Sequence, residues 1–190
     1  MPTRKYDPCY YIGIDPGLNG AIAILKSDGT IYKSIIFPTV KELSPKGRKM
    51  SRPDVKELVE IFASLSMFCY SGSYIMIEKQ VAMPGQNAIG TFNTGKGYGI
   101  LLALLQVYFP KAKVEFINCK EWQEKMIERT PVESKIRRDK RKQLKLDSIA
   151  KAKKLYPDFN FKKSAKSKVD SDGHSDALLI ATYNYCLNKK

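Results

Sequence analysis

The stretch YYIGIDPGLNGAIAILKSDGTIYKSIIF, residues 10–37, decides the fold that we expect for this chain. Residues 10–14 form a short apolar run rich in β-forming side chains, and Asp15-Pro16-Gly17 ends it as a turn. Residues 21–25 predict a second strand, and Asp28-Gly29 predicts a hairpin between it and a third strand. Three strands joined by tight turns predict an antiparallel meander at the start of the fold.

A loop and a helix are expected after the meander. Residues 38–49 have the composition of a loop, and Ser51 is expected to cap a helix that has Pro53 in its first turn. The apolar spacing that begins at Val55 predicts one buried helical face, which extends to about Cys69.

The middle of the chain predicts alternating strands and helices. Residues 74–77 are apolar and predict a central strand covered on both sides, which ends at Glu78. Residues 83–97 are rich in Gly, Asn and Thr and predict a loop that opens into an apolar helix. Residues 114–117 predict a further strand, and a helix is expected around Trp122.

The C-terminal part is basic and helical. Residues 133–168 are strongly positive, and a helix within them is expected to bury Leu146, Ile149, Ala150 and Leu155. A basic loop over residues 159–169 precedes a final helix over residues 172–187. This order predicts an α/β fold of the ribonuclease H-like pattern, a mixed five-stranded sheet with helices on both faces. We expect one domain over residues 1–190, with a basic helical insert around residues 129–168.

The charge of the chain indicates its class of partner. The formal net charge is +14, from 33 Lys and Arg against 19 Asp and Glu. A chain this basic is typical of a protein with a polyanionic partner, because Lys and Arg release counterions from a phosphate backbone. The alternative is a merely solvated surface. The predicted DNA contacts are Arg137, Arg138, Lys140, Arg141 and Lys142.

Cysteine spacing and hydropathy argue against other classes. The four cysteines are scattered and form no C-x-x-C pair, which disfavours a zinc site and predicts free thiols in a reducing, intracellular setting. No signal peptide is visible before the first predicted strand. The longest apolar stretch, residues 99–109, is too short to span a bilayer, so no membrane association is expected.

Four acids carry the predicted chemistry. Asp15 closes the first strand and Glu78 closes the fourth, while Asp172 and Asp176 are spaced i and i+4 on the final helix. Carboxylates gathered at one point repel each other unless cations lie between them. Oxygen ligands suit Mg²⁺, or Mn²⁺ in its place, and a pair of such ions can drive phosphodiester hydrolysis. The sequence therefore predicts a two-metal nuclease site.

Each acid also has a structural alternative. Asp15 before Pro-Gly is a common turn residue, and Glu78 is equally compatible with an exposed strand end. Asp172 suits the N-cap of the last helix, although Asp170 could take that position and leave Asp172 for metal. The single histidine, His174, is by default a surface residue, and the alternative is an auxiliary role beside the scissile phosphate.

Three motifs in order resemble the RuvC-type Holliday junction resolvases, most closely the phage-type and chloroplast-type branch. Residues 12–21, IGIDPGLNGA, resemble the opening motif of that family. Residues 77–79 with 82–86 resemble its second acidic motif, and residues 172–181, DGHSDALLIA, resemble its closing motif.

The resemblance implies a homodimeric endonuclease that nicks four-way DNA junctions symmetrically. It implies metal ligands at Asp15, Glu78, Asp172 and Asp176. Some relatives space the last two ligands by three residues and have a histidine at the earlier position, whereas here the acids are four apart with His174 between them.

Two other classes of protein share some of these features with a nuclease. An actin-like or sugar-kinase-like phosphotransferase shares the opening pattern but requires two such domains around a nucleotide, more than 190 residues allow. A non-catalytic branched-DNA-binding module would explain the charge but not the acids. For a homodimer, the apolar helix from about Gly97 offers an interface, and an intramolecular core helix is the alternative.

Overall fold

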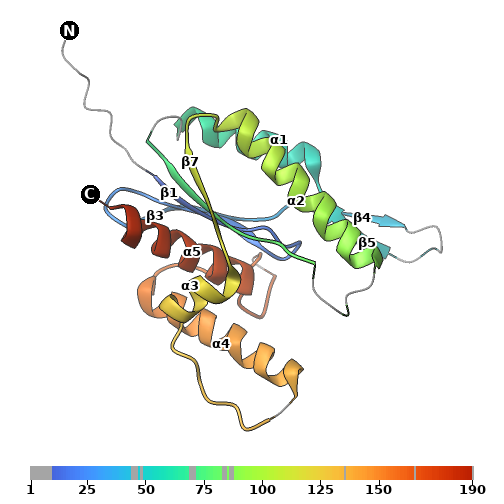
Figure 1. The fold of residues 1–190 in the computed structure, drawn as a ribbon, viewed down its shortest axis with the longest axis vertical. Helices are drawn as coiled ribbons and strands as arrows, with labels where there is room; N and C mark the ends of the chain where they lie inside the picture. The colour runs from blue at the N-terminus through green and yellow to red at the C-terminus, as the bar shows by residue number, and fades with distance from the viewer. Residues whose placement is uncertain are drawn as a thin grey trace.

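The fold is built on a five-stranded mixed sheet, shown in Figure 1. The computed structural model describes residues 10–43, 47, 49–68, 72–82, 85, 88–134, 136–164 and 166–189. The strands of the sheet are β1 (Tyr11–Asp15), β2 (Ala21–Leu25), β3 (Ile31–Ile36), β6 (Tyr74–Glu78) and β7 (Lys113–Ile117). Their order across the sheet is β3-β2-β1-β6-β7.

Strand pairing confirms the predicted fold class. β1 pairs antiparallel with β2, and β2 pairs antiparallel with β3, so the first three strands form the expected meander. β6 lies parallel to β1, and β7 lies parallel to β6. A meander followed by two parallel strands on the other side of β1 is the ribonuclease H-like arrangement, and it makes β1 the centre of the sheet.

Helices cover both faces of the sheet. They are α1 (Val55–Phe68), α2 (Ala88–Tyr108), α3 (Cys119–Met126), α4 (Arg137–Leu155) and α5 (Asp172–Asn188). In Figure 1, α1 and α2 lie on one face, and α5 lies on the other with α3 and α4 beyond it. Within the described ranges, none of these helices is long and apolar enough to cross a membrane.

Alternation along β1 divides the core into two layers. Ile12 and Ile14 pack with residues of α1 and α2, such as Leu58 and Leu101. Tyr11, one residue out of phase, packs with residues of α3, α4 and α5. Successive side chains of a strand point to opposite faces, so a central strand covered on both sides is apolar throughout.

The segment predicted as a loop after the meander is a hairpin instead. β4 (Thr39–Leu43) and β5 (Lys49–Pro53) form a separate two-stranded sheet, so Ser51 belongs to a strand and caps no helix. Helix α1 begins after Asp54, whose Oδ1 accepts a hydrogen bond of 3.1 Å from the backbone nitrogen of Glu57. The hairpin is mostly polar and exposed, so it has no apolar alternation that sequence analysis could detect.

Two helix predictions also need correction. α2 begins at Ala88, so most of the glycine-rich stretch predicted as a loop is helical. This stretch extends the helix that the strongly apolar second half of α2 forms. In α4, Leu146 and Leu155 are exposed, and the buried positions are instead Asp147, Ser148 and Ala152. The buried face of α4 is therefore partly polar. Cys69 and residues 83–84 and 86–87 lie outside the described residues.

A close backbone contact sets the position of α5 on the sheet. A Cβ atom on Gly13 would lie 2.2 Å from the backbone nitrogen of Ala181 and 2.4 Å from the carbonyl oxygen of Ala177. Only a residue without a side chain fits there, because real Cβ contacts are not this short. Gly13 therefore lets the backbone of α5 lie directly against β1.

We expect Gly13→Ala to lower the free energy of unfolding by at least about 3 kcal/mol, because the new methyl group meets backbone rather than a movable side chain. Urea denaturation followed by circular dichroism measures the change. Gly95→Ala is the matched control, since an added Cβ there meets no described atom within 4 Å. The control should stabilise α2 by up to about 1 kcal/mol. Equal stability of the two variants would contradict the close contact.

Candidate active site

Two neighbouring strand ends each supply one acid. Ile14 of β1 pairs with Ile77 of β6 in a parallel register, so Asp15 and Glu78 follow side by side at the same edge of the sheet. Burial raises the pKa of Asp15 to about 7, and the charge of Glu78 adds to that rise. Burial also raises the pKa of Glu78. The two predicted strand-end acids therefore share one partly desolvated site.

The first two turns of α5 bring the other two acids to this edge. A Cβ on Gly173 would lie 2.0 Å from the carbonyl oxygen of Asn19, so α5 begins directly against the turn that follows β1. Burial raises the pKa of Asp176 well above its usual value, and the charges of Asp15, Glu78 and Asp172 raise it further. Asp15 and Asp176 are thus each close enough to the other three acids to interact with them electrostatically.

The N-cap of α5 is neither Asp170 nor Asp172. Ser171 occupies this position, and its side chain accepts a hydrogen bond from the backbone nitrogen of His174. Asp170 forms an ion pair of 2.6 Å with Lys153 of α4. The structural alternative of an aspartate cap is therefore wrong, and Asp172 has no capping role.

Glu78 is held by two groups that sequence analysis missed. The indole nitrogen of Trp122 donates a hydrogen bond of 2.7 Å to its Oε2, and the thiol of Cys119 also bonds to it. Burial and the charge of Glu78 raise the pKa of Cys119 to about 12, so this thiol stays protonated. A fully buried Trp usually needs an acceptor for its N–H, which is the signal that could have indicated a partner for Trp122.

Helix α4 provides donors for the acids of α5. Lys145 forms an ion pair with Asp172, and Ser148 donates a hydrogen bond to Asp176. The bond to Asp172 raises the pKa of Lys145, which therefore stays charged. These contacts explain why the buried face of α4 is partly polar. Nothing in the spacing of Lys145 and Ser148 along the sequence indicates these partners.

The arrangement of the acids bears on metal binding. All four donors are carboxylates, the ligand chemistry that Mg²⁺ and Mn²⁺ prefer. Within the described ranges, however, no three acidic, cysteine or histidine side chains are arranged to hold a metal ion as they stand. Glu78, Asp172 and Asp176 are each bonded to a protein donor instead. The donor set fits a divalent cation, and binding one requires these side chains to change partners.

His174 is buried, so the default expectation of a surface histidine is wrong. Its Nδ1 lies 2.8 Å from the hydroxyl of Ser34, and its ring meets the edge of Phe159 at 5.4 Å between centroids. Burial, together with the charge of Lys163, lowers the pKa of His174 to about 4. A neutral imidazole here joins the start of α5 to β3. An auxiliary role in catalysis stays a prediction.

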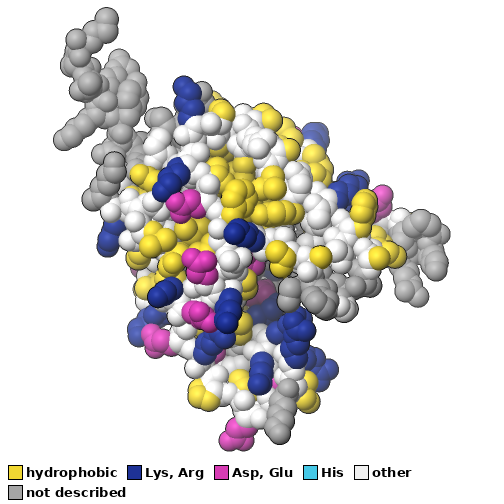
Figure 2. Space-filling view, in the orientation of Figure 1, with side chains coloured by type: hydrophobic (Ala, Val, Ile, Leu, Met, Phe, Trp, Pro, Cys, Tyr) yellow, Lys and Arg dark blue, Asp and Glu magenta, His cyan; other side chains and the backbone are white. Residues whose placement is uncertain are grey.

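The predicted DNA contacts lie on the same helix as Lys145. Arg137, Arg138, Lys140, Arg141 and Lys142 are all exposed in the first half of α4. Figure 2 shows Lys and Arg side chains gathered around the part of the molecule where α4 lies in Figure 1. The basic surface therefore extends along α4 toward the carboxylates.

Comparisons with known proteins give a likeness of fold. No family model matches the chain, and no curated protein matches it. The chain is similar to the solved structure of Thermus thermophilus RuvC in complex with a Holliday junction substrate, at 15% identity and a TM-score of 0.49 over 95% of this chain and 97% of that one. It is also similar to a structure of Thermus thermophilus RuvC alone, at 14% identity and a TM-score of 0.42 over 94% and 95%.

The raised pKa of Asp15 predicts a pH-dependent stability. The folded protein holds this proton up to about pH 7, whereas the unfolded chain releases it near 3.8, so stability falls as pH rises between these values. In EDTA at pH 8, Asp15→Asn should therefore raise Tm, by roughly 5 °C or more. The gain should shrink as the pH is lowered toward 4. Differential scanning calorimetry measures it, with the exposed Asp158→Asn as control, and a gain independent of pH would contradict the assignment.

Proposed function

We propose that this protein is a metal-dependent endonuclease that resolves four-way DNA junctions, as the sequence resemblance to the phage-type and chloroplast-type branch of the RuvC-type resolvases implies. The observation that carries the proposal is the convergence of four acids from β1, β6 and α5, beside a basic helix. Acids weaken binding to DNA and repel one another, so their presence at one place in a chain of charge +14 needs a reason. Chemistry on a phosphodiester provides that reason.

The proposed metal ligands are Asp15, Glu78, Asp172 and Asp176, which would hold two Mg²⁺ or Mn²⁺ ions. Such ions activate a water molecule and stabilise the charge that develops on a phosphodiester during hydrolysis. Two of these ligands have protein contacts that position them. The hydrogen bond from Trp122 orients Glu78, and the backbone nitrogen of Gly17 bonds to Asp15 at 3.3 Å.

Lys145 has two partners in this proposal. Its ammonium group neutralises Asp172 in the protein alone. A cation that replaces this ion pair would free Lys145, which could then donate to an oxygen of the bound phosphate. Lys145 would thus keep the site stable without metal and contribute to DNA binding when metal and substrate are present.

A non-catalytic DNA-binding module is the main alternative. Such a module has no use for desolvated acids, and raised pKa values from burial and like charges are typical of functional sites. A phosphotransferase of the actin-like or sugar-kinase-like class remains the other alternative, and ATP turnover without DNA cutting would favour it.

We predict that Asp15→Asn, Glu78→Gln and Asp176→Asn each reduce cutting of a labelled four-way junction by at least about 10³-fold, as expected when a metal ligand is lost. Junction binding should be kept, because removing an acid adds no repulsion toward phosphates. EDTA should abolish cutting by the unaltered protein. Gel assays of cleavage and binding measure both properties.

Glu60→Gln, which removes an exposed acid on α1, is the matched control and should cut at the unaltered rate. Full activity of Asp176→Asn, or full activity in EDTA, would overturn the proposed mechanism. Binding without any metal-dependent cutting would favour the non-catalytic module.

We also propose a homodimer, since paired nicks at a junction of approximate two-fold symmetry need two active sites. α2 buries Leu101, Leu104 and Leu105 against the sheet. Its opposite side exposes apolar and small residues at helical spacing, interrupted by Lys96; they are Ile89, Phe92, Gly99, Ala103 and Val107. In Figure 2, apolar side chains lie open over the region of α2 and β7. This side of α2 is the proposed interface.

Phe92→Asp combined with Val107→Glu should convert the dimer to a monomer, because charges at the centre of an apolar interface are costly to desolvate. Met67→Glu, on an exposed apolar residue of α1, is the control and should stay dimeric. Sedimentation velocity at micromolar concentration measures the state. A strict monomer in the unaltered protein, both free and on a junction, would exclude the dimer and paired cutting.

A further inference from the structure

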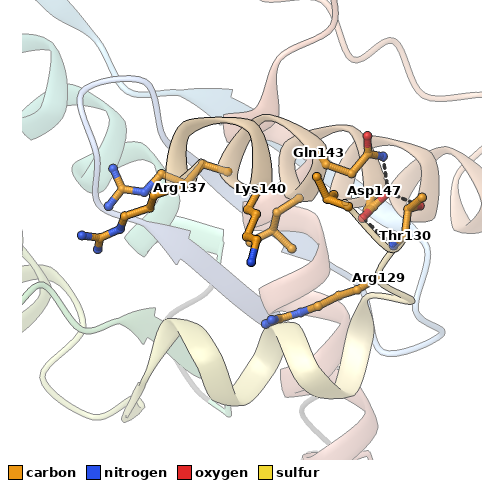
Figure 3. A pocket seen from close by; sticks show the side chains of 9 residues that line it. Arg129, Thr130, Arg137, Lys140, Gln143 and Asp147 are labelled. Atoms are coloured by element: carbon orange, nitrogen blue, oxygen red, sulfur yellow. Dashed lines mark hydrogen bonds between the residues drawn. The ribbon is translucent and has the colours of Figure 1, made fainter. Parts of the chain in front are cut away.

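A basic pocket lies beside the first half of α4, away from the four acids. Its volume is about 350 Å³, and it opens between the segment around Thr130 and α4. The lining residues are Arg129, Thr130, Val132, Arg137, Lys140, Arg141, Gln143, Leu144 and Asp147. In Figure 3, Arg129 and Lys140 extend into the same space from opposite walls.

A buried carboxylate holds the two walls together. Asp147 accepts hydrogen bonds from the backbone nitrogen of Thr130 at 2.9 Å, from its hydroxyl at 2.7 Å and from the side chain of Gln143 at 2.8 Å, as Figure 3 shows. Among the described lining residues Asp147 is the single acid, and its oxygens are occupied by these donors. These hydrogen bonds therefore hold the segment around Thr130 against α4 and fix the shape of the pocket.

The cations of the pocket form no ion pair in the described part of the chain. Four of the lining residues are basic, namely Arg129, Arg137, Lys140 and Arg141, and none of them forms an ion pair with a described acid. Like charges around one hollow repel each other unless an anion lies between them. Guanidinium groups match phosphate oxygens in geometry, and Val132 and Leu144 add an apolar wall.

We propose that this pocket binds one specific phosphodiester of the DNA strand whose scissile phosphate lies at the four acids. This inference rests on the proposed function, because that function makes DNA the ligand. It goes beyond a general basic surface, because it divides the cations of α4 into those that line the pocket and those that do not. Arg129, which precedes α4, joins the first group, while Arg138 and Lys142 belong to the second.

Helix α4 fixes the spacing between the two sites. Arg141 lines the pocket, and Ser148 on the same helix bonds to Asp176. The two residues are seven positions apart, which is about 10 Å along the helix axis at the usual rise. One strand of DNA advances about 3.4 Å per nucleotide along the duplex, so the bound phosphate lies within a few nucleotides of the cut. The pocket would thereby hold the arm of the junction in register with the acids.

Matched double variants test the pocket. Arg137→Ala with Lys140→Ala removes two pocket cations, and Arg138→Ala with Lys142→Ala removes the same charges from the same helix turns outside the pocket. Alanine favours helix, so both variants should keep α4, and circular dichroism checks this. Binding to a four-way junction is measured by fluorescence anisotropy in EDTA, at one salt concentration. We expect the pocket pair to weaken binding at least ten-fold and the control pair less than three-fold. Equal losses, or no loss in either variant, would overturn the pocket.

A series of junctions tests the position of the phosphate. In each junction, one phosphate of one strand is replaced by a neutral methylphosphonate, at a different position. Methylphosphonate at one position within a few nucleotides of the cut should weaken binding of the unaltered protein, and it should not further weaken binding of the pocket variant. A pocket for small free phosphates would show no dependence on position, and that result would overturn the proposal. Binding in EDTA needs no cutting, so a protein that fails to cut would contradict the proposed function and leave this result intact.

Discussion

The contact between the backbone of α5 and strand β1 at Gly13 is the constraint on which the rest of the structure depends. With no side chain between them, Ala177 and Ala181 lie directly on the central strand. The same helix begins against the turn after β1, where Gly173 meets Asn19. Because the two backbones are in such close contact, α5 can occupy only one position along β1. The acids of its first two turns are therefore held at the carboxyl ends of β1 and β6, beside the acids that those strands supply.

Bringing these acids together has an electrostatic cost, and the neighbouring elements offset it. Burial and mutual repulsion raise the pKa values of Asp15 and Asp176. α3 bonds to Glu78 through Trp122, and α4 supplies donors to the acids of α5. This requirement explains a helix whose buried face is partly polar and whose Leu146 and Leu155 are exposed. Under the proposed function, the same helix contacts DNA with its first half and stabilises the site with its second.

Local patterns determined much of the fold in advance. The meander was predictable because apolar strands bounded by Asp-Gly and Asp-Pro-Gly turns have signals within a few residues of each other. Asp15 and Glu78 were found as acids at strand ends, and the structure places them side by side. The β4–β5 hairpin was missed because its exposed, polar strands have no apolar alternation. The start of α2 was missed because glycine lowers helix propensity without forbidding the helix.

The sequence by itself thus determined the opening meander, the fold class, the basic charge and the acids that the final helix carries. Only the tertiary structure decided which groups hold those acids. Trp122 lies 44 residues from Glu78, and Ser148 lies 28 residues from Asp176. The hydrogen bonds that shape the basic pocket likewise join Asp147 to a loop 17 residues away. The periodicity of the sequence indicates which face of a helix or strand is apolar. A hydrogen bond between two elements depends on the relative position of both, and only the packed fold determines that position.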